Sequence, residues 1–400
     1  MVYMLFSIFP ISFERIICIP TCAEFLYAPQ AIESLARLPY RKLLLINNNC
    51  RTDASVETKE DNHLLHQWLL QYPHENIELC GFSNAYRIEY SPTLTIVLLD
   101  HSHEPFFYSA KQGVGLARGQ LSTIASQLIH AGIVTCPWMW CTDGDVRFAQ
   151  DYLEIPPDDC GTAIVPYFHN PAPIELQKYE VGMRYYSLGL EWAHFPAPFP
   201  TIGSTIIIKA DVYNRIYGFP DRMAAEDFYL LNKAYKMAPL RYLDREPIEI
   251  VGRPSERVPF GTGQAMKTIA QNDCKLDTYH PHIFQELQTW MEIIHHSTDA
   301  DLLENLSKHI PDYPNLSKFA KVLQQKANPQ NILKRRLEFF DCFQALRFIH
   351  HLRDTRYPNI PIEDALDIAP FIQKTHTTDW NTTQSTMFQE EKCLCGLYKL

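Results

Sequence analysis

Two aspartates separated by one glycine follow a short apolar run, Trp138-Met139-Trp140-Cys141-Thr142-Asp143-Gly144-Asp145. The apolar run predicts a buried strand, and residues i and i+2 at the end of a strand point to the same side. Asp143 and Asp145 can therefore aim at one hard cation, Mg²⁺ or Mn²⁺, which commonly keeps one or two carboxylates together with substrate phosphates. The alternative is that Asp-Gly-Asp only forms a turn, for which these residues are equally suited.

Two further stretches suit the recognition of phosphate. Gly113-Val114-Gly115-Leu116-Ala117-Arg118 precedes a predicted helix over 120–130. Glycines allow close approach of the backbone, a helix N-terminus favours anions, and Arg118 can reach a phosphate. The loop 253–263 contains Arg253, Arg257 and two glycines, which makes it a candidate clamp over a diphosphate. The alternatives are a simple loop before a helix and a solvated surface loop.

Glu226 and Asp227 form a second pair of carboxylates, at the start of a predicted helix. Taken alone, two acidic residues in the first turn of a helix usually compensate the helix dipole.

The elements that must position these residues alternate between apolar runs and helical patterns. Strands are predicted at 16–19, 43–46, 94–98 and 138–141, and helices at 30–38, 62–71 and 120–130. This alternation predicts an α/β fold with a mainly parallel sheet covered on both faces, whose ligands collect at the carboxyl ends of the strands. Pro20, the run Asn47-Asn48-Asn49 and the aspartate pair stand at such ends.

The rest of the chain has a different character. Residues 166–200 contain six prolines and many aromatics, which indicates a wall or lid of a site or a rigid surface crossover. A strand at 203–208, helices from 209 and 224 and a strand at 248–251 follow, and beyond about 280 only helices are expected. We therefore predict a catalytic domain at 1–275 and a helical region at 276–400.

Residues 331–357 carry apolar side chains at helical spacing with basic residues between them. This pattern predicts a helix packed on the protein with a solvated basic face, or a basic amphipathic surface that meets an anionic membrane and a lipid-linked acceptor.

The composition of the chain restricts the classes of function that it can have. A net charge of −10 and a pI near 5.9 argue against a general nucleic-acid binder. Eleven scattered cysteines favour reduced thiols in the cytoplasm. No segment reaches the ~20 apolar residues of a membrane span, and the apolar residues 1–13 are interpreted as a lead-in to the first strand or the result of a start codon placed too early.

Taken in order, these motifs resemble the family-2 glycosyltransferases of the GT-A fold, from about Arg15 to Gly263. Five stretches carry the resemblance: Ile19-Pro20-Thr21-Cys22-Ala23-Glu24, where Ala23 replaces the usual Asn; Leu45-Ile46-Asn47-Asn48-Asn49, where Asn47 replaces the usual Asp; Gly113 to Arg118; Thr142 to Asp145; and Gly218-Phe219-Pro220 to Ala225-Glu226-Asp227-Phe228.

The resemblance implies a Rossmann-like sheet and a role for each motif. Pro20, Thr21, Glu24, Asn47 and Asn49 would border the nucleotide, and Gly115, Arg118 and Arg257 its phosphates. Asp145 would bind the metal and Asp143 the metal or the ribose. Asp227 would be the general base, with Glu226 beside it. A later histidine often adds a metal ligand in this fold, and His280 and His282 are the candidates, although a surface position is the alternative for both.

The resemblance thus predicts an inverting, metal-dependent glycosyltransferase that moves a sugar from a nucleotide-diphosphate donor to a hydroxyl acceptor, which is a glycan, a lipid-linked molecule or a small molecule. Two alternatives stay open: a non-catalytic nucleotide-sugar-binding protein, and a sugar-1-phosphate nucleotidyltransferase. The latter reaction calls for a Gly- and Arg-rich loop after the first strand, where this chain has Pro20 to Glu24.

Overall fold

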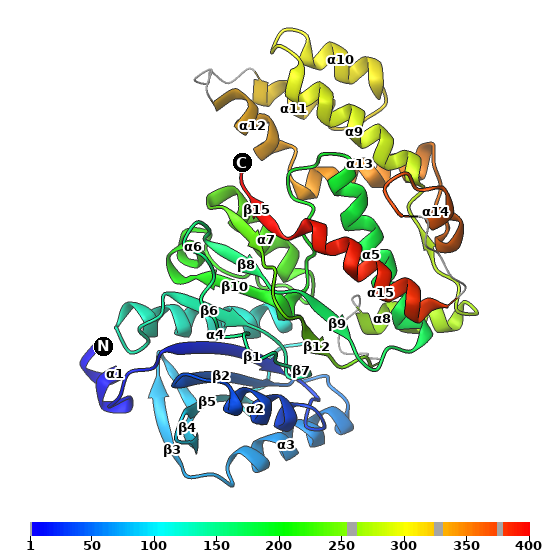
Figure 1. Ribbon diagram of the computed structural model, residues 1–400. Coiled ribbons are helices and arrows are strands. Elements are labelled where there is room, and N and C mark those ends of the chain that lie inside the picture. The colour runs from blue at the N-terminus through cyan, green and yellow to red at the C-terminus, as the bar shows by residue number, and fades with distance from the viewer. Residues whose placement is uncertain (1, 254–261, 324–330, 374–378) are drawn as a thin grey trace. The chain divides into compact units, whose positions relative to one another are not determined.

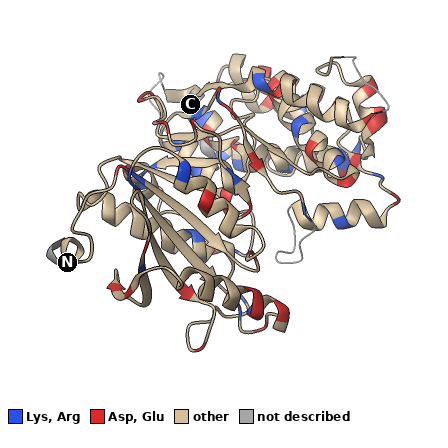
Figure 2. Ribbon diagram, turned by 60° about the horizontal axis from the view of Figure 1, so that its bottom comes forward, with Lys and Arg blue, Asp and Glu red and all other residues tan. Residues whose placement is uncertain are grey.

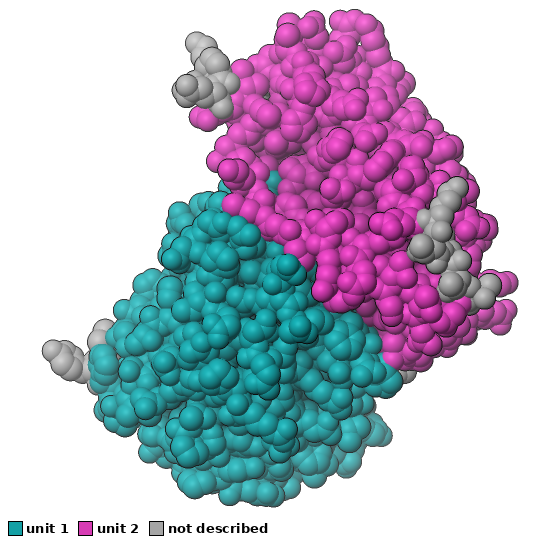
Figure 3. All heavy atoms as spheres, in the orientation of Figure 1, with its two compact units in different colours: residues 1–171, 201–264 teal, residues 172–200, 265–400 magenta. Residues whose placement is uncertain are grey.

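The computed structural model describes residues 2–253, 262–323, 331–373 and 379–400, which form two compact units (Figures 1 and 3). Unit 1 comprises residues 1–171 and 201–264, and unit 2 comprises residues 172–200 and 265–400. This division differs from the predicted one at 275/276, because residues 172–200 belong to the second unit.

Unit 1 is a mixed α/β structure around a large twisted sheet (Figure 1). Its strands in that sheet lie in the order β11 (Leu240–Tyr242), β8 (Thr162–Ile164), β10 (Ile206–Lys209), β6 (Trp138–Cys141), β1 (Arg15–Thr21), β2 (Lys42–Asn49), β5 (Leu94–His101), β4 (Phe82–Ser91) and β3 (His74–Leu79). The central strands β6, β1, β2 and β5 are parallel, whereas β10 is antiparallel to β6 and the β3–β4 hairpin is antiparallel to β5. The predicted parallel centre is confirmed, and the hairpin is an addition.

Helices cover both faces of this sheet, as predicted. Helices α2 (Ala28–Arg37) and α3 (Val56–Leu69) contribute to a core that includes Ile17, Leu44 and Trp140, and α4 (Val114–His130) contacts β1, β2 and β6. Because side chains alternate between the faces of a strand, near-continuous apolar runs such as Leu43 to Ile46 supply both cores. Unit 1 also contains α1 (Val2–Ile8), η1 (Gly203–Thr205), α6 (Ala210–Arg215) and α7 (Glu226–Met237).

A small second sheet of unit 1 pairs β12 (Ile248–Ile250) with β7 (Val146–Arg147) and β9 (Tyr167–His169). Strand β7 begins directly after Asp145, and it is antiparallel to β12. This pairing brings the segment that follows β12 to the aspartate pair.

Unit 2 is mainly helical (Figure 1). Its helices are α5 (Ile174–Trp192), α9 (Pro281–His296), α10 (Leu302–His309), α11 (Leu316–Leu323), α12 (Ile332–Phe339), α13 (Cys342–Thr355), α14 (Ile362–Ile368), α15 (Trp380–Glu391) and η3 (Lys392–Leu394), and α8 (Thr262–Gln271) crosses the division between the units. The expectation that strands vanish after about 280 is wrong in detail, because β14 (Ile360–Pro361) pairs with β13 (Asp277–Thr278), and β15 (Gly396–Tyr398) follows.

The proline-rich stretch 166–200 contains a long helix that its composition did not predict. Its prolines flank α5, a helix of 19 residues, with Pro173 at the N-cap. The buried Arg184 of α5 forms ion pairs with Glu180 and with Glu391 of α15, so the two helices share a buried charged contact.

The predicted basic helix 331–357 is two helices. Asp341 accepts hydrogen bonds from the backbone N–H groups of Phe343 and Gln344 and thereby caps a new helix, α13. Several of the basic residues have acidic partners: Arg336, which is buried, pairs with Asp299, and Arg356 pairs with Asp312. Figure 2 accordingly shows blue and red segments interspersed along the helices of unit 2.

Candidate active site

The turn between β6 and β7 presents the aspartate pair in unit 1. Thr142 N donates to Cys18 O at 3.0 Å, which extends the pairing of β6 with β1 by one residue before the chain turns. Asp143 and Asp145 therefore stand in a turn at the carboxyl end of the sheet, as predicted for ligands of this fold class. Among the described residues, no group of three or more His, Cys, Asp and Glu side chains is arranged to hold a metal ion.

Glu24 packs against this turn. A Cβ atom added at Gly144 would overlap the Glu24 carboxylate, so the bare glycine backbone is what admits a third acidic side chain. Glu24 is buried and follows Ala23, whose φ of 52° is uncommon for a residue with a side chain. Strained backbone of this kind is often found at functional sites.

Arg253 bridges Asp145 and Glu24. Its Nη2 donates to Asp145 Oδ2 at 3.0 Å and to Glu24 Oε1 at 2.9 Å, and its guanidinium lies 4.5 Å from the ring centre of Tyr27. The β7–β12 pairing positions it, since Val251 N donates to Asp145 O at 2.9 Å two residues earlier. The sequence pointed to this loop but the prediction was placed on Arg257, which lies outside the described residues.

Arg118 holds the other carboxylates of the site. Its Nη2 donates to Asp143 Oδ1 at 2.6 Å, its Nε to Glu226 Oε1 at 2.9 Å and its Nη1 to Gly203 O at 3.1 Å. Burial alone would lower the pKa of Arg118, but Asp143 and Glu226 raise it overall. Only 5% of the Arg118 side chain is exposed, so this residue orients two carboxylates within the protein rather than extending toward a phosphate.

Glu226 and Asp227 begin α7, as the sequence predicts. Ala225 precedes them with a φ of 62°, so a left-handed alanine stands before Glu226 just as one stands before Glu24. Glu226 is buried against Arg118, whereas Asp227 is partly exposed and accepts a hydrogen bond from Phe228 N at 2.7 Å.

The pKa of Asp227 lies well above the ordinary value of an aspartate. Burial and then the negative charge of Glu226 raise the pKa of Asp227 from 3.8 to about 7, while the Phe228 N–H and Arg118 oppose the rise. A carboxylate with a pKa near neutrality can accept a proton and release it again at neutral pH.

The glycine-rich start of α4 is covered by the chain itself. Gly115 N donates to Arg222 O at 3.0 Å, and a Cβ at Gly115 would lie 2.5 Å from Pro220 O and 2.6 Å from Arg222 O. The glycine therefore admits the close approach of the loop 220–222, and the predicted contact of Gly115 with a phosphate stays a prediction.

The asparagine run at the end of β2 is used for internal hydrogen bonds. Asn47 Nδ2 donates to Tyr108 OH at 2.9 Å and to Gln120 Oε1 at 2.8 Å, and Asn49 Nδ2 donates to Thr21 O at 2.9 Å. Both asparagines are buried. These bonds form a polar frame at the carboxyl ends of β1 and β2, where Pro20 and Thr21 also lie.

Asn62 of α3 completes this frame and was not singled out by the sequence. Its Nδ2 donates to Asn49 O at 2.7 Å, and its Oδ1 accepts from Ala23 N at 2.7 Å, so it joins the ends of β1 and β2. An amide can do both because it carries a donor and an acceptor. The only signal was a polar residue on the buried side of a predicted helix.

His280 and His282 lie in unit 2. His280 caps α9 by accepting a hydrogen bond from His282 N at 3.2 Å, and both rings pack with Tyr357. These contacts account for both residues without a metal.

Two general features of the described chain bear on its environment. None of its helices combines the length and the apolarity that a membrane crossing requires. All eleven cysteines are free thiols.

The comparisons with known proteins add little. No protein-family model matches the chain, and no curated protein matches it in sequence. Among solved structures, the chain is similar to the mannosyltransferase PcManGT from Pyrobaculum calidifontis in complex with GDP-Man and Mn²⁺, with 13% identity, a TM-score of 0.37 and coverage of 96% of this chain and 86% of that chain. A similarity this distant carries no argument about activity, so the function has to be argued from the residues of unit 1.

Proposed function

We propose that this chain is a metal-dependent, inverting glycosyltransferase that moves a sugar from a nucleotide-diphosphate donor to a hydroxyl group. The observation that carries the proposal is the cluster at the carboxyl end of the unit 1 sheet. It combines the carboxylates of Glu24, Asp143, Asp145, Glu226 and Asp227 with the guanidinium groups of Arg118 and Arg253.

The donor set of the turn fits a divalent cation. Mg²⁺ and Mn²⁺ take oxygen ligands and commonly use only one or two protein carboxylates, with substrate phosphates and water completing the shell. Asp145 and Asp143 would supply these oxygens, and Gly144 keeps the backbone between them bare. When bound, the cation would neutralise charge that develops on the departing diphosphate.

Asp227 is the proposed general base. A sugar hydroxyl is a poor nucleophile at neutral pH, and a carboxylate that accepts its proton typically contributes ~10²–10⁴-fold in rate. Asp227 combines partial exposure with a pKa of about 7. Burial raises the pKa of Asp227 most, the charge of Glu226 raises it further and Arg118 lowers it, so Glu226 and Arg118 are positioning residues.

Arg253 is the proposed cationic partner of the donor diphosphate. It already contacts Asp145, and only 14% of its side chain is exposed. Guanidinium groups bind phosphate oxygens through two donors at once. The sequence supports the same role for Arg257.

We further propose that the C-terminal helices bind the acceptor or contact a membrane peripherally, in the cytoplasm.

The proposal is tested first by donor binding. Calorimetry with a panel of nucleoside diphosphates should show binding in Mn²⁺ that falls at least tenfold in a chelator and in Asp145→Ala. Asp211→Ala is a matched control, because 64% of that side chain is exposed on α6. Equal affinity in Mn²⁺ and in a chelator would contradict the metal assignment.

The second test separates an enzyme from a non-catalytic nucleotide-sugar-binding protein. Hydrolysis of a nucleotide sugar by the purified protein should fall by ~10²-fold or more in Asp227→Asn, while donor affinity stays within about twofold. A raised pKa at a partly exposed carboxylate favours the enzyme, because binding alone does not call for such a group. Donor binding without hydrolysis or transfer under any condition would support the binding protein instead.

A further inference from the structure

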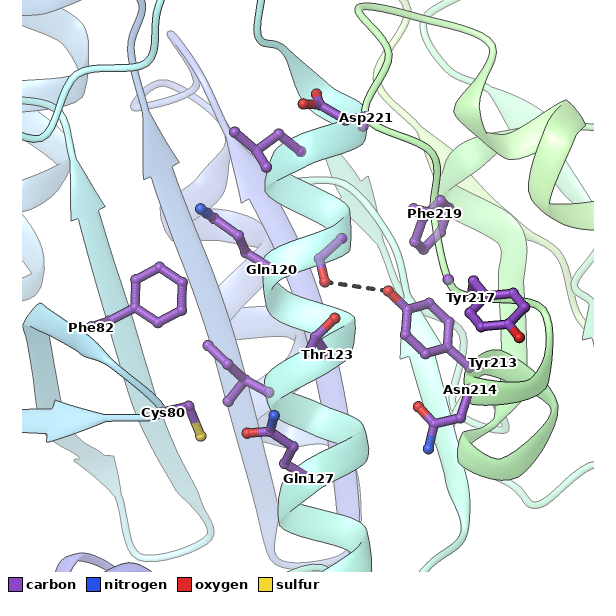
Figure 4. Close-up of a pocket in the computed structure, with 15 residues that line it drawn as sticks. Cys80, Phe82, Gln120, Thr123, Gln127, Tyr213, Asn214, Tyr217, Phe219 and Asp221 are labelled. Carbon is purple, nitrogen blue, oxygen red and sulfur yellow. Dashed lines mark hydrogen bonds between the residues drawn. The ribbon is translucent and has the colours of Figure 1, made fainter. Parts of the chain in front are cut away.

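A groove with a volume of about 500 Å³ lies over the outer side of α4 in unit 1. Figure 4 shows Phe82 on one side of the helix and Tyr213, Tyr217 and Phe219 on the other, with Gln120 and Gln127 projecting from α4 between them. Pockets of this size commonly hold small ligands. The lining residues extend from Gly115 to Gln127 along α4, which is about 18 Å at the rise of an α-helix.

The charges of the groove exclude several classes of ligand. Asp221 is the single acidic residue among the described residues that line it, and none of these is a lysine or an arginine. A phosphate, a sulfate or an acidic polymer would therefore meet repulsion without a counter-charge. An acyl chain is also a poor match, because it would cover the amide of Gln127 and the Nε2 group of Gln120, whose Oε1 already accepts from Asn47 and Tyr108, without offering them hydrogen bonds.

The remaining chemistry suits a neutral ligand with flat apolar faces and many hydroxyl groups. Aromatic rings offer apolar faces, and side-chain amides offer donors and acceptors that match hydroxyl groups. A sugar ring has this character, with C–H groups on its faces and hydroxyl groups around its edge.

Tyr217 is the strongest single indication. The residue is 92% exposed, so its ring is open to a ligand that binds in the groove. The turn that presents it has positive φ at both Tyr217 (61°) and Gly218 (66°). Nearby, Tyr213 OH donates to Gly119 O at 3.2 Å, a bond drawn in Figure 4, and this fixes a second ring as a wall of the groove.

We propose that the groove over α4 binds a neutral oligosaccharide, with Tyr217 against a sugar face and with Gln120 and Gln127 on its hydroxyl groups. This goes beyond the proposed transfer, because the binding requires neither donor nor metal. The end of the groove at Gly115 lies one helical turn before Arg118, so a bound chain would be held beside the start of α4 and near the acidic cluster.

The test mixes the full chain with uncharged gluco-, manno- and galacto-oligosaccharides in the absence of Mn²⁺ and nucleotide. Saturation-transfer NMR and calorimetry measure the binding. We expect at least one series to bind, with saturation transferred from aromatic protons. Tyr217→Ala should weaken binding about tenfold. Phe6→Ala, an exposed aromatic on α1, is the matched control and should leave the affinity unchanged.

A second variant tests the groove by filling it in a protein that is expected to stay folded. A Cβ at Gly119 would have no neighbour closer than 3.8 Å, and leucine is a better helix former than glycine, so Gly119→Leu should fill the groove while the protein stays folded. We expect it to reduce oligosaccharide binding more than tenfold. Absence of binding to the whole panel, or equal binding by wild type, Tyr217→Ala and Gly119→Leu, would overturn the proposal. A charged oligosaccharide bound more tightly than its neutral counterpart would do so too. None of these results depends on donor chemistry.

Discussion

Replacing Arg118 by methionine should destabilise unit 1 by about 3–5 kcal/mol, because it leaves a buried carboxylate without its partner. Only 5% of the Arg118 and Glu226 side chains is exposed, and the methionine cannot donate to Gly203 O either. Asp143 contributes less to this cost, since 29% of it is exposed and water can hydrate it. Urea unfolding, followed by hydrogen–deuterium exchange of peptides from α4, reports the change in this unit.

An exposed ion pair on α2 and a double variant provide the controls. Arg37 pairs with Glu33 on α2 with 70% and 58% of the side chains exposed, so Arg37→Met should cost less than about 1 kcal/mol. Replacing Arg118 and Glu226 together should cost at least about 2 kcal/mol less than the sum of the two single changes, because the double variant no longer leaves the buried Glu226 carboxylate unpaired. If Arg118→Met costs no more than Arg37→Met, the buried ion pair does not carry the stability assigned to it.

Three other predictions follow from the geometry of the site. Because the folded-state pKa of Asp227 lies above its ordinary value of 3.8, its protonation favours folding at low pH and this contribution is lost as the pH rises toward 7. Donor hydrolysis should conversely rise with pH to an inflection near 7, and Glu226→Gln should move that inflection to lower pH in a pH–rate profile; an unchanged inflection would contradict the electrostatic coupling. Arg253→Ala should raise the affinity for Mn²⁺ in the absence of nucleotide, measured by calorimetry, because the guanidinium competes for the Asp145 carboxylate; weaker Mn²⁺ binding would show that it does not compete. Gly115→Ala should cost about 1–3 kcal/mol, because its Cβ meets fixed backbone, whereas Gly119→Ala should stabilise α4 by up to about 1 kcal/mol in thermal unfolding; equal effects would show that the loop 220–222 gives way.

The part of the fold that sequence reasoning predicted well is the part in which the local pattern and the tertiary environment agree. The apolar runs of β1, β2, β5 and β6 are buried on both faces, so their composition alone indicates central parallel strands. The hairpin β3–β4 was missed because most of its residues are exposed or half-buried, so its sequence carries no continuous apolar run. Helix α5 was missed because the prolines that flank it dominate the composition of the stretch.

The residues of the candidate site were likewise predicted only where a local sequence pattern marks them. Motifs with local spacing predicted that Asp143, Asp145, Glu226 and Asp227 are functional candidates, and the structure brings the first three onto two arginines. The identity of the second arginine depends on the pairing of β7 with β12, which joins residues about 100 positions apart and leaves no local pattern. Spacing also could not show that Gly115 serves the packing of its own loop.

The two arginines of the acidic cluster differ in how easily each can be displaced from its carboxylates. The Arg118 guanidinium binds Asp143, the buried Glu226 and the backbone carbonyl of Gly203. Moving Arg118 away would leave the Glu226 carboxylate unpaired in a medium of low dielectric constant. Arg253 joins Asp145 to Glu24 at the edge of the same cluster, where it is more exposed than Arg118. A cation that enters under the proposed function should therefore displace Arg253 from Asp145 rather than Arg118 from Asp143. The displaced guanidinium then becomes available to the anionic diphosphate, which makes metal and donor binding mutually favourable. Under the proposed function, Arg118 would thus hold Asp143 and Glu226 in place, and Arg253 would couple metal binding to donor binding.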